Sequence, residues 1–171
     1  MIFSRKALKY VLYPAIVVVL FGIVVLSTWH PVPVGAEECA TKFLSLGQEG
    51  KIDSLYSLSG GAFGVPDSAF RRAYFLIDST TGGIVSFRRR NSQKSVHGGY
   101  FVTFAVGVRR FGRGDCCVFI EDNASTQTGY AVQGLDISVG ESTRPQDMVS
   151  FRIDGSAIWS YSGPIRKAGS E

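Results

Sequence analysis

A long apolar run near the start of the chain is the strongest pattern in the sequence. Residues 11–28 (VLYPAIVVVLFGIVVLST) carry no charge, and no formally charged residue occurs between Lys9 and Glu37. At about 1.5 Å per residue, a helix of this length spans about 27 Å, close to the roughly 30 Å of a bilayer core. We therefore expect a transmembrane helix over residues 11–29, preceded by a tail over residues 1–10.

The charges that flank this run predict its orientation. Three basic residues precede it and two acidic residues follow it: Arg5, Lys6, Lys9, Glu37 and Glu38. Basic residues beside a span stay on the cytoplasmic side, so the tail should be cytoplasmic and the chain from residue 30 onward periplasmic or extracellular. A cleaved secretory signal is the alternative, because Val34-Gly35-Ala36 offers small residues before Glu37. The length of the apolar run favours an uncleaved anchor.

Three short helices are predicted after the span. Residues 30–36 contain two prolines and should form an extended linker. Apolar residues then recur at helical spacing in three segments: 37–46, a short stretch from Lys51, and a stretch from Pro66 to Gly82-Gly83. Residues 57–65 are rich in glycine and serine, and predict a loop.

From Ile84 the apolar period changes to two, which indicates strands. The expected strands cover 84–90, 99–109, 116–121 and 130–139. The alternation shifts phase around Gly134, which indicates a β-bulge. Residues 141–171 then contain a predicted hairpin, with Asp154-Gly155 as its turn, and a tail. The expected fold is α+β, with about three short helices packed on a curved antiparallel sheet in a domain over residues 37–140.

This element order and two short motifs resemble the cone-shaped, cystatin-like domains of the nuclear transport factor 2-like superfamily. The motifs are A-x-x-F-L…G (Ala40, Phe43, Leu44, Gly47) and G-aromatic-x-V-x-G (Gly129, Tyr130, Val132, Gly134). The resemblance implies helices on the concave face of the sheet and a pocket at its wide end. Members include enzymes, scaffolds and bacterial membrane-anchored proteins, so fold alone does not decide function.

Few residues are candidates for catalytic chemistry. His97, the only histidine of the domain, lies in an expected turn, and Asp67 is best explained as a helix cap or first-turn acid. No acid–base pair and no metal-ligand spacing occurs. We therefore expect a non-enzymatic binding or assembly domain without a cofactor. A pocket for a small apolar ligand, or an enzyme of the same fold, is the alternative; its lining candidates are Phe43, Tyr56, Phe63, Tyr74, Phe101 and Phe104, residues that more often form a core.

The basic residues are unevenly distributed. The net charge is +4, yet from Glu37 onward 15 basic residues face 14 acidic ones. Six arginines form an expected basic patch: Arg88, Arg89, Arg90, Arg109, Arg110 and Arg113. Such asymmetry suits anionic membrane lipid or an acidic partner protein. The expected partners are thus lipid, other membrane or periplasmic proteins and a second copy of the chain, but not nucleic acid. Asp115 is expected to pair with Arg113 or Arg110.

The three cysteines cannot all pair within the chain. Cys116 and Cys117 are adjacent in a strand, so their side chains should point to opposite faces. A disulfide between Cys39 and Cys117 or Cys116 is geometrically allowed in an oxidising compartment. Packing as small buried hydrophobic groups is the simpler interpretation.

Overall fold

The computed structural model describes residues 14–20, 31–139 and 148–163. The chain divides into two units, Met1–Pro31 and Val32–Glu171. In the first unit, residues 14–20 are helical. Within the described residues, no helix has the length and apolar character that a membrane span requires. The other residues of the predicted span, 11–13 and 21–29, lie outside the described residues, as does the tail over 1–10.

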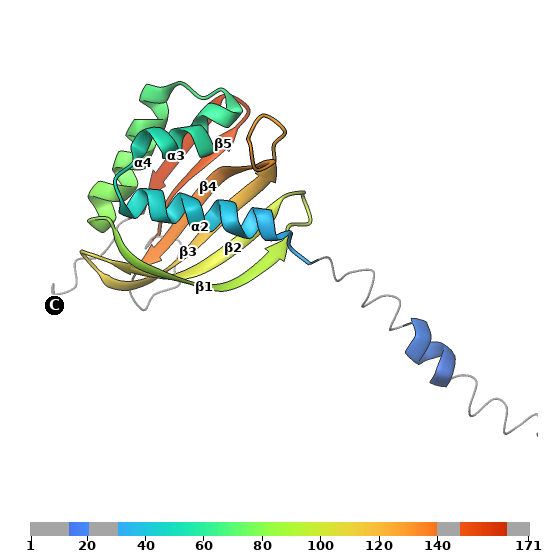
Figure 1. Ribbon diagram of the computed structural model, residues 1–171. Coiled ribbons are helices and arrows are strands. Elements are labelled where there is room, and N and C mark those ends of the chain that lie inside the picture. Colours follow the sequence, from blue (N-terminus) through green and yellow to red (C-terminus); the bar gives the residue numbers. More distant parts are fainter. Residues whose placement is uncertain (1–13, 21–30, 140–147, 164–171) are drawn as a thin grey trace, which may run out of the picture. The chain divides into compact units, whose positions relative to one another are not determined.

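The second unit is α+β, as predicted (Figure 1). Its helices come first: α2 (Val34–Gln48), α3 (Ile52–Leu58), the 3-10 helix η1 (Gly60–Phe63) and α4 (Asp67–Thr81). Six strands follow: β1 (Ile84–Lys94), β2 (Tyr100–Val108), β3 (Gly112–Asp122), β4 (Tyr130–Val139), β5 (Met148–Asp154) and β6 (Ala157–Ser162). They form one antiparallel sheet in the order β1-β2-β3-β4-β5-β6.

Helix α2 begins three residues earlier than predicted, inside the expected linker. Pro33 precedes the first helical residue, and its carbonyl accepts a hydrogen bond from the Ala36 N–H at 3.0 Å. A proline at the start of a helix costs little, because the first N–H groups have no partner within the helix. Ala36 is fully buried, so packing stabilises this extra turn.

The predicted loop over residues 57–65 is largely helical. Helix α3 runs to Leu58, and η1 follows after Ser59. Ser59 and Gly60 are buried, and a Cβ on Gly60 would lie 2.9 Å from the Phe70 ring. The small residues here allow the chain to pack closely against α4.

Helix α4 has the predicted boundaries. It begins at Asp67 after Pro66 and ends at Thr81, and the next residue, Gly82, caps it with a φ of 73°, the left-handed conformation that glycine adopts readily. Asp67 is the acid of the first turn, as one of its two expected roles, and it accepts a hydrogen bond from Arg71 Nε at 2.7 Å. Its side chain makes no capping bond.

The bulge predicted around Gly134 is confirmed. Phe119 pairs with Gly134 and Ile120 with Val132, which leaves Gln133 as an extra residue in β4. An extra residue bends a strand and increases its twist. Figure 1 shows the strands curving around α2.

The C-terminal hairpin continues the same sheet. The structure confirms strands on both sides of the Asp154-Gly155 turn, and β5 pairs with β4 from Gly134 to Ser138. Phe151 is buried, with its ring 6.4 Å from that of Phe43 and 6.0 Å from that of Phe70. The hairpin therefore contributes to the core between the helices and the sheet.

Candidate functional site

One face of the sheet carries the core and all the described helices of the second unit. The buried residues of β2 and β3 alternate along each strand, with Val102 and Phe104 as examples in β2 and Cys116 and Val118 in β3. Successive side chains of a strand point to opposite faces. The residues between them therefore belong to the other face, which we call the helix-free face.

A row of paired residues crosses the helix-free face. The strand registers place these residues directly opposite one another in turn: Phe101, Phe119, Gly134, Arg152 and Trp159. Directly opposite residues in antiparallel strands share a face and contact one another. The row therefore runs unbroken from β2 to β6.

Arg152 is the centre of this row. Its guanidinium carbon lies 3.1 Å from the centroid of the Phe119 ring, and its Nη2 donates to Asp136 Oδ2 at 2.6 Å. Phe101 meets Phe119 edge to face, with ring centroids 4.6 Å apart. A Cβ on Gly134 would lie 2.7 Å from Arg152 Nη1, so only glycine lets the arginine cross β4 to reach Phe119. These residues form one cluster, which we call the Arg152 cluster: Phe101, Phe119, Gly134, Asp136 and Arg152.

The row ends in exposed aromatic side chains on β6. Trp159 is 67% exposed and Tyr161 is 51% exposed. Tyr161 pairs with Ser150 in the next row, beside Asp136. Exposed aromatic groups next to arginine are enriched at protein interfaces.

Burial is the largest cause of the pKa shift at two groups of this face, Asp136 and Cys117. It raises the pKa of the Asp136 carboxyl above its ordinary 3.8, although Arg152 acts in the opposite direction. Burial also raises the pKa of the Cys117 thiol, which a hydrogen bond with Thr103 opposes. A thiol with a raised pKa holds little thiolate and reacts slowly. The cluster is suited to contact rather than to nucleophilic chemistry.

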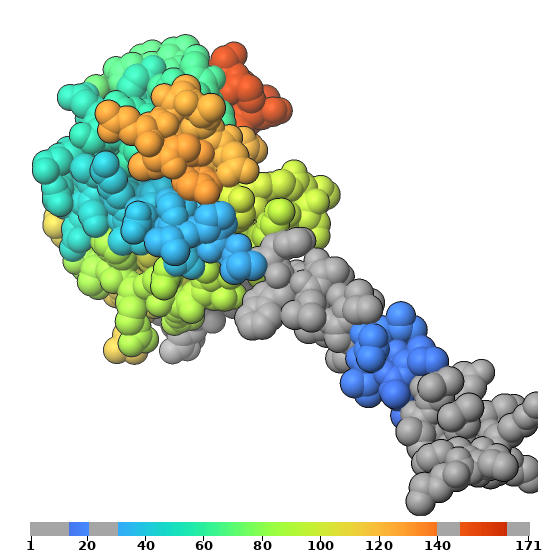
Figure 2. All heavy atoms as spheres, turned by 45° about the vertical axis from the view of Figure 1, so that its right-hand side comes forward, coloured from blue at the N-terminus to red at the C-terminus, as the bar shows by residue number. Residues whose placement is uncertain are grey.

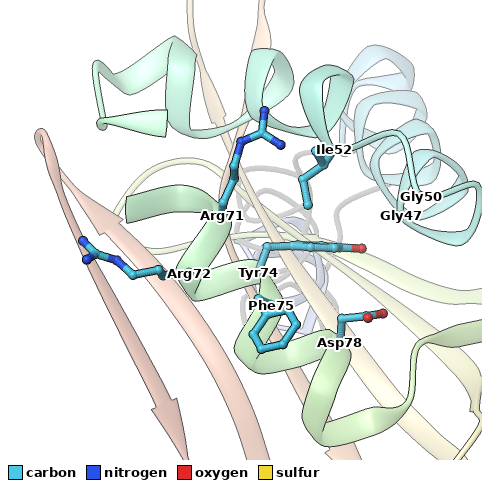
Figure 3. A pocket seen from close by; sticks show the side chains of 8 residues that line it. All are labelled: Gly47, Gly50, Ile52, Arg71, Arg72, Tyr74, Phe75 and Asp78. Carbon is cyan, nitrogen blue, oxygen red and sulfur yellow. The ribbon is translucent and has the colours of Figure 1, made fainter. Parts of the chain in front are cut away.

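A second feature is a hollow on the helical side, with a volume of about 550 Å³ (Figure 3). Its lining comes from α4, from the end of α2, from the start of α3 and from the turn between α2 and α3: Gly47, Gly50, Ile52, Arg71, Arg72, Tyr74, Phe75 and Asp78. Figure 3 shows the Tyr74 hydroxyl pointing towards Gly47, while the Arg72 side chain points in the opposite direction. Arg71 is held by Asp67 and Asp53, and Phe75 is 68% exposed.

The six pocket candidates do not surround one cavity. Phe43 and Phe104 are buried in the core, and Tyr56 and Tyr74 pack partly buried against it. Phe101 lies on the helix-free face, on the far side of the sheet from Phe104. Of the six, Tyr74 alone lines the hollow in Figure 3. Phe63 also packs partly buried against the core.

The six arginines of the expected basic patch do not form one surface. Arg89 of β1 contacts Glu37 of α2, on the helical side. Three of the others line a shallow groove of about 300 Å³ on the opposite side: Arg88, Arg90 and Arg113. Arg109 and Arg110 lie exposed in the turn between β2 and β3. Asp115 pairs with Arg90 at 2.8 Å, and not with Arg113 or Arg110 as expected. Strands β1 and β3 lie on either side of Ala105 in β2, which brings Arg90 of β1 within reach of Asp115 of β3 on the helix-free face.

All three cysteines are free, so the Cys39–Cys117 disulfide is not formed. The sheet separates the two residues, because Cys39 is on α2 and Cys117 is on the helix-free face. Cys116 is buried on the helical side, which confirms that the adjacent pair points to opposite faces. Burial raises the pKa of Cys39 to about 11, and its thiol donates to the Tyr130 carbonyl at 3.6 Å.

The Arg152 cluster was not predicted from the sequence. Polar and apolar residues alternate in the VSFRID segment of β5, so Arg152 lies on the other face of the strand from the buried Phe151 and Ile153, and Gly134 marks the predicted bulge. The missing information was that β5 pairs with β4, which brings the two residues together. Register between strands distant in sequence is not encoded in periodicity.

Within the described part of the chain, no three or more metal-ligating side chains are grouped, and His97 is exposed in the β1–β2 turn. No family model, no curated protein and no solved structure matches the chain.

Proposed function

We propose that the chain is a single-pass membrane protein that presents a non-cytoplasmic binding or assembly domain and has no enzymatic activity of its own. Two features of the sequence support the membrane part: the uncharged run over residues 11–28, and the basic residues before it. The predicted relationship to the nuclear transport factor 2-like superfamily stays a prediction. Three helices packed on one face of an antiparallel sheet are consistent with it.

The helix-free face is the observation that carries the binding function. It presents Trp159 and Tyr161 exposed, with Arg152 fixed between Phe119 and Asp136. A fixed arginine loses little side-chain entropy when a partner binds, which raises affinity for the same contact area. Rigid aromatic and arginine groups of this kind make up most binding hot spots.

A photo-crosslinker can test this face directly. Gln93 is exposed and pairs with Phe101, so a benzoylphenylalanine at position 93 lies in the same row as the Arg152 cluster. In membranes that contain the full chain, we expect light to produce protein adducts at this position. The matched control places the same group at Ser54, which is exposed on α3 of the helical side. Recovery of monomer alone at both positions would contradict the proposal.

The hollow in Figure 3 supports a second candidate function, the binding of a small ligand with an apolar part. Its volume of about 550 Å³ is within the range of ligand pockets, roughly 300–1,000 Å³. Gly47 keeps it open, since a Cβ there would collide with the Tyr74 hydroxyl. Native mass spectrometry of the full chain from detergent tests this function. A ligand retained by the wild type and lost on Gly47→Val would favour it, and the absence of retained mass would exclude it.

A further inference from the structure

We propose that two copies of the chain pair antiparallel along β6, with Ser160 opposite Ser160 of the second copy. The two six-stranded sheets then join into one. This inference rests on the proposed assembly function, and it names the partner and the register through which the assembly forms. Three independent features of β6 lead to it.

The first feature is the character of β6 as an edge strand. It pairs with β5 on one side, and among residues 31–139 and 148–163 no strand pairs with its other side. Its sequence AIWSYS has no charge and no proline, and residues 159–162 are all exposed. Proteins usually protect an edge strand from pairing with charges, proline or a bulge. Beyond its short length, β6 has none of these.

The second feature is the contrast with β1, the edge at the other side of the sheet. Strand β1 carries four basic residues: Arg88, Arg89, Arg90 and Lys94. Its register shifts between Arg89 and Asn91, and Glu37 of α2 binds its Arg89 and Ser92. Charge, a bulge and a covering helix therefore protect β1. The same molecule leaves β6 unprotected, which is expected of an edge that is used.

The third feature is that β6 is complementary to itself. A two-fold axis through Ser160, perpendicular to the sheet, places Trp159 opposite Tyr161 of the second copy and Tyr161 opposite Trp159. Directly opposite aromatic residues in an antiparallel pair stabilise the sheet. A register shifted by one residue would instead set Trp159 against a serine whose side chain points to the other face, so the aromatic pairs would be lost.

The helical side of β6 also accommodates this register. Beyond Ile158, the residues of β6 on that side are Ser160 and Ser162, which are small and exposed. Helix α4 packs against β5 and β6 on the same side, so small residues here leave room for a second sheet. Figure 2 shows the β5–β6 hairpin, in red, standing out at the margin of the surface. The row from Phe101 through Arg152 to Trp159 would then continue across both copies.

The register predicts one disulfide. The experiment uses the full chain in its membrane with Cys117→Ser, because Cys117 is the only half-buried thiol and Cys39 and Cys116 are buried. Adding Ser160→Cys sets two thiols opposite each other on the axis, where Cα atoms of paired strands lie about 4.5–5.5 Å apart, within disulfide range. Mild oxidation should convert this chain into a covalent dimer on a non-reducing gel.

Ser162→Cys in the same background is the matched control. Ser162 is exposed on the same side of β6, but in the proposed register it lies opposite Ile158 of the second copy. Its thiol is then about 13 Å along the strands from its counterpart, beyond disulfide reach. We expect no dimer from this control, and we expect Trp159→Lys to abolish the dimer of the Ser160→Cys chain.

The outcomes separate this inference from the proposed function. A dimer from Ser160→Cys but not from Ser162→Cys supports the register. Equal dimer from both, dimer from neither, or a disulfide from Ser160→Cys to a different protein overturns it. If Gln93 still crosslinks to other proteins while Ser160→Cys stays monomeric, only the β6 pairing fails. If neither position finds a partner, the proposed function fails with it.

Discussion

At the scale of residues, Gly134 and Arg152 depend on each other. The arginine reaches Phe119 and Asp136 only because nothing projects from β4 between them. The backbone of β5 is also close there, since a Cβ on Gly134 would lie 2.7 Å from the Phe151 carbonyl oxygen. Backbone cannot move aside as a flexible side chain can, so this glycine is required by packing.

Gly134→Ala should therefore destabilise the domain by about 1–3 kcal/mol, the usual cost of overpacking. Chemical denaturation of the full chain in detergent measures this loss. Gly107→Ala is the control, because its Cβ would meet the Ser86 Oγ at 2.5 Å, and a hydroxyl can rotate away. Equal losses for the two variants would show that the close approach at Gly134 is not as described.

Asp136 predicts a pH dependence whose sign distinguishes burial from ion pairing. Burial raises its pKa in the folded state, despite Arg152. Between the unfolded and the folded pKa, the folded state keeps a proton that the unfolded state loses, so stability falls as pH rises through this window. The wild type should therefore lose stability relative to Asp136→Asn as the pH rises from acid towards neutral, because the asparagine does not titrate. The unfolding free energy of the wild type minus that of the variant should decrease over this range. A difference that increases with pH would mean that the ion pair with Arg152 outweighs burial.

The candidate residues were only partly predictable from the sequence. Strand alternation alone puts Phe101 and Phe104 on opposite faces of β2, as the structure has them, so a cavity that both residues line could have been excluded from the sequence. It could not show that Phe119 and Arg152, in strands separated by a third, would stack. Contacts within a strand follow from the local pattern, whereas contacts across strands depend on register.

At the scale of elements, a buried serine joins the helical segment to the sheet. Ser59, between α3 and η1, is fully buried, and its Oγ donates to the Val132 carbonyl oxygen at 2.6 Å. Val132 directly precedes the bulge in β4. The bond therefore holds η1 against the bent part of the sheet.

Ser59→Ala should cost about 1–3 kcal/mol of stability, because the buried carbonyl loses its donor. Ser57→Ala, on the exposed side of α3, should change stability by no more than about 0.5 kcal/mol. Thermal or denaturant unfolding of both variants gives the comparison. A Ser59→Ala protein as stable as the control would show that the bond contributes nothing net.

The elements themselves were largely predictable, with errors at their ends. Hydrophobic period identified three helices and the strands, and glycine and proline signals located α4 and the bulge. The start of α2 and the helical part of residues 57–65 were missed, because burial of Ala36, Ser59 and Gly60 stabilises helix where composition indicates loop. Local propensity is a weak signal that tertiary packing overrides.

At the scale of the whole second unit, the C-terminal hairpin is integral to the domain. Phe151 of β5 is 1% exposed and contacts aromatic rings of both α2 and α4. The hairpin also brings Arg152, Trp159 and Tyr161 to the helix-free face. Core and candidate surface therefore depend on the same two strands.

Phe151→Ala should destabilise the domain by about 3–5 kcal/mol, the typical cost of removing a buried phenylalanine. Phe75→Ala removes the same side chain from an exposed position on α4 and should cost about 0.5 kcal/mol or less. Denaturant unfolding compares the two. Similar small losses would mean that the hairpin is not part of the core.

The sidedness of the domain is the central claim of the proposed function. The measurement that tests it most directly is a C-terminal fusion to a reporter enzyme that is active only outside the cytoplasm, combined with alkaline carbonate extraction of the membranes. The three basic residues before the apolar run predict an active reporter, and the uncleaved anchor predicts that the fusion stays in the membrane pellet. An inactive reporter would contradict the orientation, and a fusion released by carbonate would contradict the anchor.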